Sequence, residues 1–423
     1  MSRVFAIELR RSAALGTALI VLVAGVLLLF FAEGIGFATG WMQLAMTQRL
    51  YLAVLWPLAL AAGAWQASRE RRANVAELFA STPRPRAHRT VPTLGAMAAA
   101  VVAGYLAMGI AGGLWIVGTA EYLPLSIFAV TAVGALALIA AAWLGLAIGR
   151  LLPWPVTAPA LGVAGLGLLL LIPGATRPRG WLALVFSPIY EMNMPDAYTT
   201  VPGRVSAAQA IWLGALAFTA VLLFASGSWR LRVAALLPVV AGAALAIAVM
   251  PHQNRSVIAA IDPVAKELVC ADGAPRVCVS RVHAGLLPEV TAPAREGLAL
   301  LAKLPGAPTE VNEDTTTYVP DVYPPWRTDV VLLRVKAGQD GHLAERDQVP
   351  AEVVRGAFAS PPTCDRSAPH EELQAAAHWL IGSPPADDPA AVQQWESLQR
   401  MPADKALARV AALRQAALTC SVT

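Results

Sequence analysis

Long apolar stretches separated by short polar segments dominate the first 250 residues of the chain. A helix needs about 20 mostly apolar residues to cross the hydrocarbon core of a bilayer. Charged side chains inside such a helix are costly, and these stretches hold almost none. The pattern therefore predicts seven membrane spans, at residues 13–32, 50–66, 94–118, 127–149, 156–172, 207–225 and 233–250.

The rest of the chain, residues 251–423, has the shorter and more mixed pattern of a water-soluble domain. Two short strands are predicted on either side of a turn at Asp272-Gly273, and the Val/Leu run within 328–337 indicates another strand. Helices are predicted at 290–304, 370–382 and 402–420. We therefore expect a polytopic α-helical membrane domain, residues 1–250, followed by a soluble α/β or α+β domain, residues 251–423.

The composition supports this division into a membrane domain and a soluble domain. The chain is 57% hydrophobic and only 14% charged, the first aspartate is Asp196, and all four lysines follow residue 260. The net charge of +4 is compatible with a nucleic-acid partner, but the arginines cluster at the ends of apolar stretches and no basic patch is interleaved with aromatic residues. The pattern indicates membrane lipid as the partner and excludes nucleic acid.

Arginine placement predicts the orientation. Arginines are frequent before the first stretch, in the loop after the second, and after the fourth and sixth, whereas the alternate connections hold few, Arg49 among them. Cytoplasmic loops are the arginine-rich ones, so the N-terminus is expected in the cytoplasm and residues 251–423 outside. The first stretch is too long for a signal-peptide core and lacks an obvious cleavage site, so we expect a permanent span.

The four cysteines provide an independent indication of the compartment. All of them, Cys270, Cys278, Cys364 and Cys420, lie in the part expected outside the membrane. An even number of cysteines in such a domain indicates disulfides in an oxidising compartment. Three pairings are formally open; we favour Cys270 with Cys278, as a short hairpin staple, and Cys364 with Cys420, which ties down the C-terminal end.

The loop "SRERRANVAELFASTPRPRAHRT", residues 68–90, contains a short amphipathic pattern. Val75, Leu78 and Phe79 share one helical face, and the pair Thr82-Pro83 is expected to end the helix. A helix this short is not stable alone and needs a partner surface. That surface is either lipid headgroups or another protein.

This loop resembles the coupling-helix region of type-2 ABC exporter permeases. The resemblance rests on Glu70, on the pair Glu77-Leu78 and on the ending "STPR", and it extends to "FAIELRRS", which resembles the amphipathic N-terminal helix of that family. The segment 180–193 occupies the place of the family's extracellular re-entrant helices, within the region 173–206. A seventh span, a large external domain and Asn74-Val75 in place of the family's usual Gly-Thr depart from the pattern. The resemblance implies ATPase-coupling roles for Glu70, Arg71, Arg72, Val75, Glu77, Leu78 and Phe79, and places Glu8, Arg10 and Arg11 in the N-terminal helix.

The resemblance also implies partners. The chain has no phosphate-binding loop of the G-x-x-x-x-G-K-[ST] type, so ATP and magnesium are expected on a separate ATP-binding cassette subunit. Two permease chains, identical or different, are expected in one transporter. No enzymatic activity, cofactor or metal is expected on this chain, and its expected location is the plasma membrane of a bacterium.

The predicted spans also bear on the energy source and the cargo. Ion-driven carriers place Asp, Glu or His within their spans, and these spans hold none. We therefore expect an ATP-driven exporter of a hydrophobic or amphipathic cargo, with the external domain as a lid or cargo guide. Candidate pathway-lining residues are Tyr51, Trp56, Gln66 and Thr157; packing against lipid or other helices is the alternative for each.

Two other classes of function remain open. "HEELQAAAH" begins like the zinc motif H-E-x-x-H, but Gln374 stands where the second histidine belongs and His378 lies off the face of His370. The alternative function is therefore a membrane-anchored extracytoplasmic protein that binds a ligand or resembles a degenerate metallohydrolase.

Overall fold

The chain folds into two compact units. The computed structural model describes residues 13–32, 34–69, 86–189, 197–252, 260–318, 321–361, 364, 368–386 and 388–421. The first unit, the membrane unit, comprises Met1–Val117 and Leu123–Ile261, and the second, the C-terminal unit, comprises Gly118–Tyr122 and Asp262–Thr423. The chain passes from the membrane unit to the C-terminal unit between residues 261 and 262, and residues 118–122 belong to the C-terminal unit.

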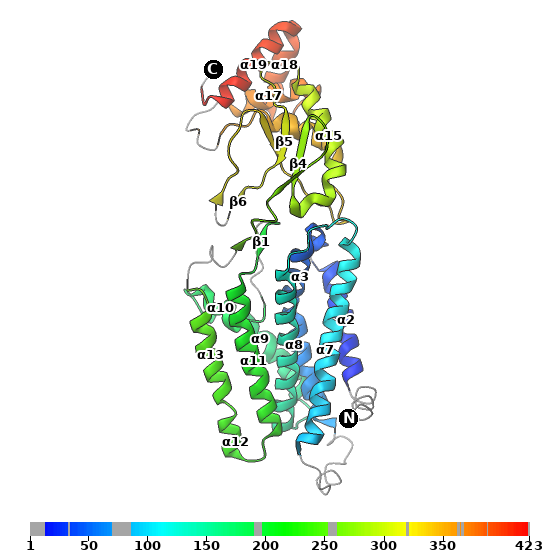
Figure 1. Cartoon of the computed structure of the whole chain (residues 1–423), viewed down its shortest axis with the longest axis vertical. Helices are drawn as coiled ribbons and strands as arrows, with labels where there is room; N and C mark the ends of the chain where they lie inside the picture. Colours follow the sequence, from blue (N-terminus) through cyan, green and yellow to red (C-terminus); the bar gives the residue numbers. More distant parts are fainter. Residues whose placement is uncertain are drawn as a thin grey trace. The chain divides into compact units, whose positions relative to one another are not determined.

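Helices form nearly all of the membrane unit (Figure 1). Among the residues that the structure describes, six helical stretches are long and apolar enough to cross a membrane, and the bent pair α3 and α4 makes a seventh if it counts as one span. The elements in chain order are α2 (Ala14–Phe31), η1 (Gly36–Thr39), α3 (Trp41–Leu50), α4 (Leu52–Ala67), α7 (Arg86–Ile116), α8 (Ser126–Leu151), α9 (Thr157–Ala175), α10 (Gly180–Phe186), β1 (Thr199–Thr200), α11 (Gly203–Ala225), α12 (Trp229–Ala234), α13 (Leu237–Val249) and β2 (Ala260–Ile261).

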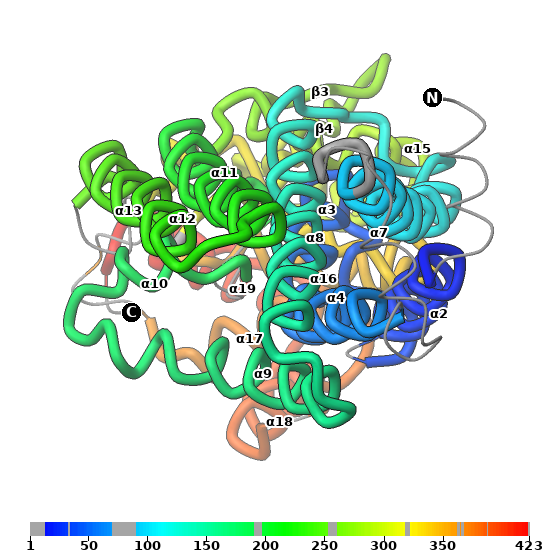
Figure 2. Tube along the Cα trace, turned by 90° about the horizontal axis from the view of Figure 1, so that it is seen from below, coloured from blue at the N-terminus to red at the C-terminus, as the bar shows by residue number. Residues whose placement is uncertain are grey.

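The helix α8 is the centre of this bundle. It packs against α4, α7 and α11, and the view along the helices in Figure 2 shows it between α11 and α4. The approach of α4 and α8 is close because glycines face the neighbouring backbone. A Cβ at Gly63 would overlap the carbonyl oxygen of Ala142, and one at Gly145 would overlap that of Leu60. Small residues at such crossings are typical of helix packing in membranes.

The outer surface of the bundle is apolar. Leu19 on α2, Leu170 on α9 and Leu237 on α13 are 60%, 73% and 69% exposed. Monomeric water-soluble proteins rarely expose apolar surface of this extent, whereas lipid-facing helices do so normally. Hydropathy, helix length and exposed side chains thus all indicate a helical membrane domain.

The C-terminal unit is built on a four-stranded sheet. Its strand order is β3-β4-β5-β8; β3 pairs antiparallel with β4, whereas β4, β5 and β8 run parallel. The elements are β3 (Leu268–Cys270), β4 (Arg276–Ser280), η2 (Arg281–Leu286), α15 (Leu287–Leu301), β5 (Glu310–Glu313), β6 (Thr317–Tyr318), β7 (Asp321–Val322), β8 (Val330–Leu333), η3 (Arg346–Gln348), α16 (Val349–Gly356), α17 (His370–Ile381), α18 (Pro389–Arg400) and α19 (Ala403–Leu418).

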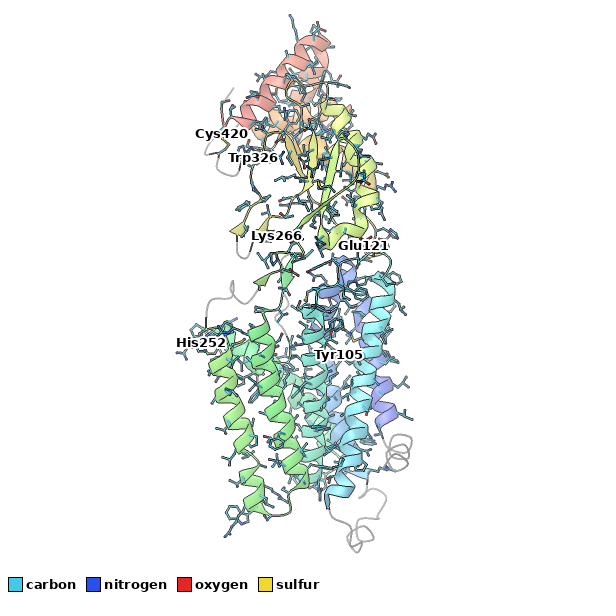
Figure 3. All side chains as sticks on the ribbon, in the orientation of Figure 1. Tyr105, Glu121, His252, Lys266, Trp326 and Cys420 are labelled. Carbon is cyan, nitrogen blue, oxygen red and sulfur yellow. A yellow bond between two sulfur atoms is a disulfide. The ribbon has the colours of Figure 1, made fainter. Side chains whose placement is uncertain are left out.

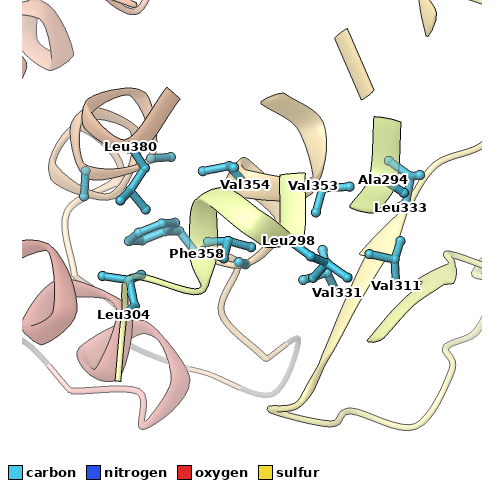
Figure 4. Close-up of a cluster of buried hydrophobic side chains, with 14 of the residues drawn as sticks. Ala294, Leu298, Leu304, Val311, Val331, Leu333, Val353, Val354, Phe358 and Leu380 are labelled. Carbon is cyan, nitrogen blue, oxygen red and sulfur yellow. The ribbon is translucent and has the colours of Figure 1, made fainter. Parts of the chain in front are cut away.

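The core of the C-terminal unit lies on one face of this sheet. Successive side chains of a strand point to opposite faces, and on β8 the buried Val331 and Leu333 point toward α15 and α16. Figure 4 shows them with Leu298 and Val353 in one apolar cluster. The other two residues of β8, Val330 and Leu332, are only partly buried and belong to the opposite face.

The segment Gly118–Tyr122, which connects α7 with α8, is anchored in the C-terminal unit. The Tyr122 hydroxyl donates to Asp262 Oδ2 at 2.7 Å. Burial and this hydrogen bond raise the pKa of Tyr122 to about 12, so the phenol keeps its proton and remains a donor. Gly285 packs so closely on the Thr119 carbonyl that a Cβ there would overlap it.

Candidate functional site

A buried arginine is the most unusual feature of the membrane unit. Arg49, in the last turn of α3, is fully buried. Its Nε and Nη2 donate to the carbonyl oxygen of Pro188, at 3.1 and 2.8 Å, and Nη2 also donates to Gln209 Oε1 at 3.1 Å. Gln209 is itself fully buried on α11, and its Nε2 donates to the Leu184 carbonyl of α10 at 2.8 Å. One guanidinium thus connects α3 with α11 and with the segment that follows α10.

A second set of polar groups adjoins this arginine. Gln48 Nε2 donates to the Tyr105 carbonyl of α7 at 3.3 Å. The Tyr105 hydroxyl is buried and has no hydrogen-bond partner among the described residues. On α8, a Cβ at Gly134 would overlap this hydroxyl and would lie 3.0 Å from Arg49 Cδ. Gly134 therefore makes room for both side chains, and Figure 3 shows Tyr105 within the bundle.

Buried apolar side chains lie on the helices that contribute to and adjoin this cluster. Met46 on α3, Val130 on α8, Leu184 on α10 and Val205 on α11 belong to one buried group. A buried polar or charged side chain is expensive unless it is hydrogen-bonded, and more so among membrane helices. The retention of a cation among these side chains identifies the Arg49 cluster (Gln48, Arg49, Tyr105 and Gln209) as the candidate functional site of the membrane unit.

The sequence pattern alone did not predict this site. Arg49 was assigned to an arginine-poor connection between spans, whereas the structure places it in a helix that continues, after a bend of 51°, into α4. Gln43, Gln48 and Arg49 lower the hydropathy of α3. These residues stand directly before an uninterrupted apolar stretch, with no turn residue between. That position could have indicated a helix that continues into the span.

The four candidate pathway residues are all buried. Tyr51 lies at the bend between α3 and α4, and Trp56 packs against the position of Gly165 on α9. Gln66 Oε1 accepts from the Ala13 backbone N–H at 2.9 Å, and Thr157 Oγ1 donates to the Leu152 carbonyl at 2.7 Å. These contacts give Gln66 and Thr157 a role in holding helix ends, and a lining role for any of the four stays a prediction.

The residues assigned to ATPase coupling and to the N-terminal helix lie outside the described residues. These are Glu70, Arg71, Arg72, Val75, Glu77, Leu78 and Phe79 in the loop and Glu8, Arg10 and Arg11 near the N-terminus. Of the described helices on either side of the loop, α4 ends at Ala67 and α7 begins at Arg86. The loop therefore connects two apolar helices, and its coupling role stays a prediction.

Both expected disulfides are present in the C-terminal unit. Cys270 pairs with Cys278 across the antiparallel strands β3 and β4, and Cys364 pairs with Cys420 just after α19. The first closes the hairpin around Gly273, whose φ of 86° lies in the left-handed region that suits glycine. The second fixes the C-terminal end over a separation of 56 residues. Two disulfides indicate that this unit matures in an oxidising, extracytoplasmic compartment.

A buried serine, histidine and glutamate meet at the carboxyl ends of β4 and β5. Glu313 accepts from the Ser280 hydroxyl at 2.8 Å and from the Ser280 backbone N–H at 2.7 Å, and His283 Nδ1 lies 2.6 Å from Glu313 Oε1. In a nucleophilic triad the serine donates to the ring nitrogen opposite the one that faces the acid. Here the same nitrogen faces both groups, and the serine donates to the carboxylate. The set holds η2 to the sheet and does not have the geometry of a nucleophile with its base.

Metal-ligand geometry is not found within the described ranges. Among those residues no group of three or more His, Cys, Asp or Glu side chains is placed to hold a metal ion. His370 begins α17, and His378 Nδ1 lies 3.1 Å from the Ser383 carbonyl. Burial lowers the pKa of His378 below its ordinary value, which favours the neutral ring.

A pocket of about 260 Å³ opens on the face of β8 opposite the core of the C-terminal unit. Its floor includes Val330 and Leu332, and one wall is the segment Tyr323-Pro324-Pro325-Trp326. Polar groups and the end of α16 complete the lining, through Asp314, Thr316, Arg327, Arg334, Gly356, Ala359 and Ser360. Pockets of this kind, with apolar walls and a few polar groups, are typical of small-molecule sites.

Within the described residues, the Arg49 cluster in the membrane unit and the pocket beside β8 in the C-terminal unit have the features of functional sites. The chain matches no protein-family model, no curated protein and no solved structure.

Proposed function

We propose that this chain is the membrane-spanning subunit of an ATP-binding cassette exporter, driven by a separate ATPase chain. The observation that carries the proposal is a bundle whose described helices provide six or seven apolar spans, with residues 68–85 connecting α4 to α7. That connection contains the segment that resembles a coupling helix. A second permease chain, identical or different, completes the transporter.

The charged residues of the membrane bundle bear on the energy source of transport. The described helices of the membrane unit carry no aspartate and no glutamate, which are the usual ion-binding groups of ion-driven carriers. Their one fully buried charge is Arg49, a cation that stays protonated at any physiological pH. A permanent cation does not load and release protons, so an external ATPase suits this bundle better than proton coupling.

The membrane orientation follows from chain connectivity together with the arginine pattern. Residues 118–122 and the residues from Asp262 onward belong to one folded unit, so both reach the same side of the membrane. The disulfides make that side the oxidising one. The N-terminus and the loop 68–90 then face the cytoplasm of a bacterial cell, where ATP is available to the partner.

The cargo in this proposal is hydrophobic or amphipathic, and the C-terminal unit acts as a lid or guide for it. Spans without acidic groups favour a cargo that is largely apolar. The Arg49 cluster supplies the one strongly polar point of the described bundle, at the bend between α3 and α4. A change in that bend would move the segment after α10, because Arg49 holds its Pro188 carbonyl.

The coupling loop provides the test. Replacing Leu78 and Phe79 with aspartate removes the apolar face, whose burial in a partner groove would contribute about 1.5–3 kcal/mol per side chain. We expect the ATPase chain to be lost on affinity purification. The matched control, Leu78→Val with Phe79→Leu, keeps the face apolar and should retain the partner. Full recovery of the ATPase by the aspartate variant, with normal ATP hydrolysis, would contradict the proposal.

A second candidate function is favoured by the pocket beside β8. It is a membrane-anchored extracytoplasmic domain that binds a ligand without export. The two functions differ in one observable. The exporter requires an ATPase chain that co-purifies with the unmodified protein, whereas the anchored binder does not.

A further inference from the structure

The last apolar span of the membrane unit consists of two helical segments, α12 and α13. The helix α13 alone has 13 residues, which correspond to a length of about 20 Å and are too few to cross a hydrocarbon core of about 30 Å. The stretch Trp229–Val249, which includes α12, has 21 residues and is long enough. The six residues of α12 are therefore needed for this span to cross the membrane.

The two segments continue one another. The Ala235 N–H donates to the Leu231 carbonyl at 2.9 Å, and the Val240 N–H donates to the Leu236 carbonyl at 3.3 Å. The interruption has a local cause, because Pro238 in the first turn of α13 has no N–H for the helical ladder. Figure 1 shows α12 at the end of α13, and Figure 2 shows both helices beside α11 at the margin of the bundle.

The side chains of α12 are all accessible, and they are of two opposite kinds. Trp229, Leu231 and Val233 are 70%, 59% and 58% exposed. Arg230 and Arg232 are exposed as well. Exposed apolar side chains are unfavourable in water, and arginines are unfavourable in hydrocarbon. A segment that combines both suits the boundary between them, where tryptophan is enriched and arginine side chains extend to the headgroups.

The positive charge of α12 is not neutralised within the part of the chain that the structure describes. Neither Arg230 nor Arg232 has an ion-pair partner there, and the described residues of the membrane unit include no Asp or Glu. The Arg230 guanidinium carbon lies 5.8 Å from the centre of the Trp229 ring. Arg150 adds a cation near the turn before α12, since its Nη1 donates to the Phe224 carbonyl of α11 at 2.6 Å.

We propose that α12 binds the headgroups of anionic phospholipids. Arg230 and Arg232 project about 200° apart around the helix, so each contacts a different lipid. The planar guanidinium donates paired N–H groups to the phosphate oxygens, which it matches in geometry. The acyl chains lie along α13, where Leu237 and Val240 are 69% and 65% exposed. Cations without a partner carboxylate favour a lipid with net negative charge over a zwitterionic one.

The test titrates lipid onto the full chain in a neutral detergent. The lipids are dioleoylphosphatidylglycerol and, as the zwitterionic matched lipid, dioleoylphosphatidylcholine. Native mass spectrometry counts the lipid molecules bound at each concentration and gives a dissociation constant for each step. A basic residue at a membrane surface typically changes the affinity for anionic lipid about fivefold, so we expect tightly bound phosphatidylglycerol with at least about this preference over phosphatidylcholine. No ATPase is involved, so the proposal does not depend on the exporter proposal.

The double variant Arg230→Gln with Arg232→Gln locates the site. It should lose two of the tightly bound phosphatidylglycerol molecules, whose affinity falls about fivefold, while binding of phosphatidylcholine stays unchanged. Arg230→Lys with Arg232→Lys keeps both charges and should keep both molecules. The matched control is Arg177→Gln with Arg179→Gln, which removes two exposed arginines from the connection between α9 and α10, outside the candidate spans, and should also keep them.

Unfolding midpoints equal to that of the unmodified chain establish that the variants fold. If the double glutamine variant does not fold, each single glutamine variant should lose one lipid molecule. An unchanged number of tightly bound phosphatidylglycerol molecules in a folded glutamine variant would overturn the proposal, whether or not that variant loses a co-purifying protein. An equal loss in the control at Arg177 and Arg179, or equal affinities for the two lipids in the unmodified chain, would also overturn it.

Discussion

The guanidinium of Arg49 and the carbonyl of Pro188 form a forked contact inside the membrane unit. Nε and Nη2 of the arginine both reach this one oxygen, at 3.1 and 2.8 Å, across a sequence separation of 139 residues. Pro188 lies just after the end of α10 at Phe186, and the arginine donates to its carbonyl. The contact fixes the segment after α10 against the end of α3.

The fork predicts the effect of Arg49→Lys. Lysine keeps the charge, but its single ammonium group cannot donate from two nitrogens to Pro188 and also reach Gln209. We expect the free energy of unfolding to fall by about 1.5–3 kcal/mol, the value of a hydrogen bond to a charged group. Thermal unfolding of the full chain in detergent measures it. Arg230→Lys, at an exposed position of α12, is the control, and equal midpoints for both variants would remove the structural role of the fork.

The two disulfides should contribute unequally. In the chain-entropy account, a bridge stabilises by restricting the unfolded chain, and the effect grows with the closed loop. The separations of 8 and 56 residues correspond to about 2.5 and about 4 kcal/mol. Replacing Cys364 and Cys420 with serine should therefore lower the unfolding midpoint of the C-terminal unit more than replacing Cys270 and Cys278. The reverse order, or free thiols in mass spectra of the unreduced protein, would contradict this.

The pair Glu289 and His342 predicts a pH dependence of stability. Glu289 Oε1 lies 2.7 Å from His342 Nδ1, and Oε2 accepts from the Leu343 N–H at 2.8 Å. Burial raises the pKa of Glu289, but the hydrogen bonds from His342 and Leu343 outweigh it, so the pKa is below its ordinary value. The hydrogen bond that His342 donates to Glu289 raises the pKa of His342 above its ordinary value.

The two partners change the stability in opposite directions as the pH rises. The contribution of His342 is complete below its unfolded pKa, about 6.5, and is lost as the pH rises through its higher folded pKa. The contribution of Glu289 is complete above its unfolded pKa, about 4.3, and is lost as the pH falls through its lower folded pKa. The stability difference between the unmodified chain and His342→Asn should therefore be largest between about pH 4.3 and 6.5. A difference that is flat from pH 4 to 9 in thermal unfolding would rule out the ion pair.

Much of the fold was predictable, because hydropathy and turn chemistry act locally. The predicted spans overlap α2, α4, α7, α8, α9, α11 and α13, and the hairpin around Gly273 is where its Asp-Gly turn indicated. The strand β5 was missed because its sequence, Glu-Val-Asn-Glu, looks like a surface segment. Its side chains are buried because β4 and β8 flank it and because Ser280 and His283 satisfy Glu313.

The candidate sites were less predictable, for a different reason. Arg49 is a charge that a hydropathy profile assigns to a loop, and only the partners Pro188 and Gln209, far away in sequence, make its burial tolerable. The pocket beside β8 combines a strand with a proline-rich segment and the end of α16. No local sequence pattern predicts that these three segments lie together, because none of them has an unusual sequence when taken alone.

The anchoring of residues 118–122 predicts a sharp effect at Gly285. A Cβ at this position would overlap the Thr119 carbonyl, so either the backbone or the segment must shift. Overpacking of this kind costs about 1–3 kcal/mol, and we expect Gly285→Ala to lower the unfolding midpoint of the C-terminal unit. Gly118→Ala is the matched control in the same segment, because a Cβ there meets nothing within 4 Å. Equal midpoints for the two variants would show that the segment is not held at Gly285.

The proposed role of the C-terminal unit as a lid can be tested by deleting that unit. The pairing of β1 with β2 decides after which residue the chain should be shortened. A deletion after Met250 would remove β2, whose residues Ala260 and Ile261 pair with β1 in the membrane unit. A deletion after Ile261 keeps this pairing. It leaves residues 118–122 without their partners, so Tyr122→Phe in the full chain serves as the control for loss of the Tyr122–Asp262 bond alone.

If the C-terminal unit guides the cargo, the shortened chain should still bind the ATPase and support ATP hydrolysis, while export changes in rate or selectivity. Export equal to that of the full chain would exclude the lid, and loss of ATPase binding would show instead that the C-terminal unit is needed for the membrane unit to assemble.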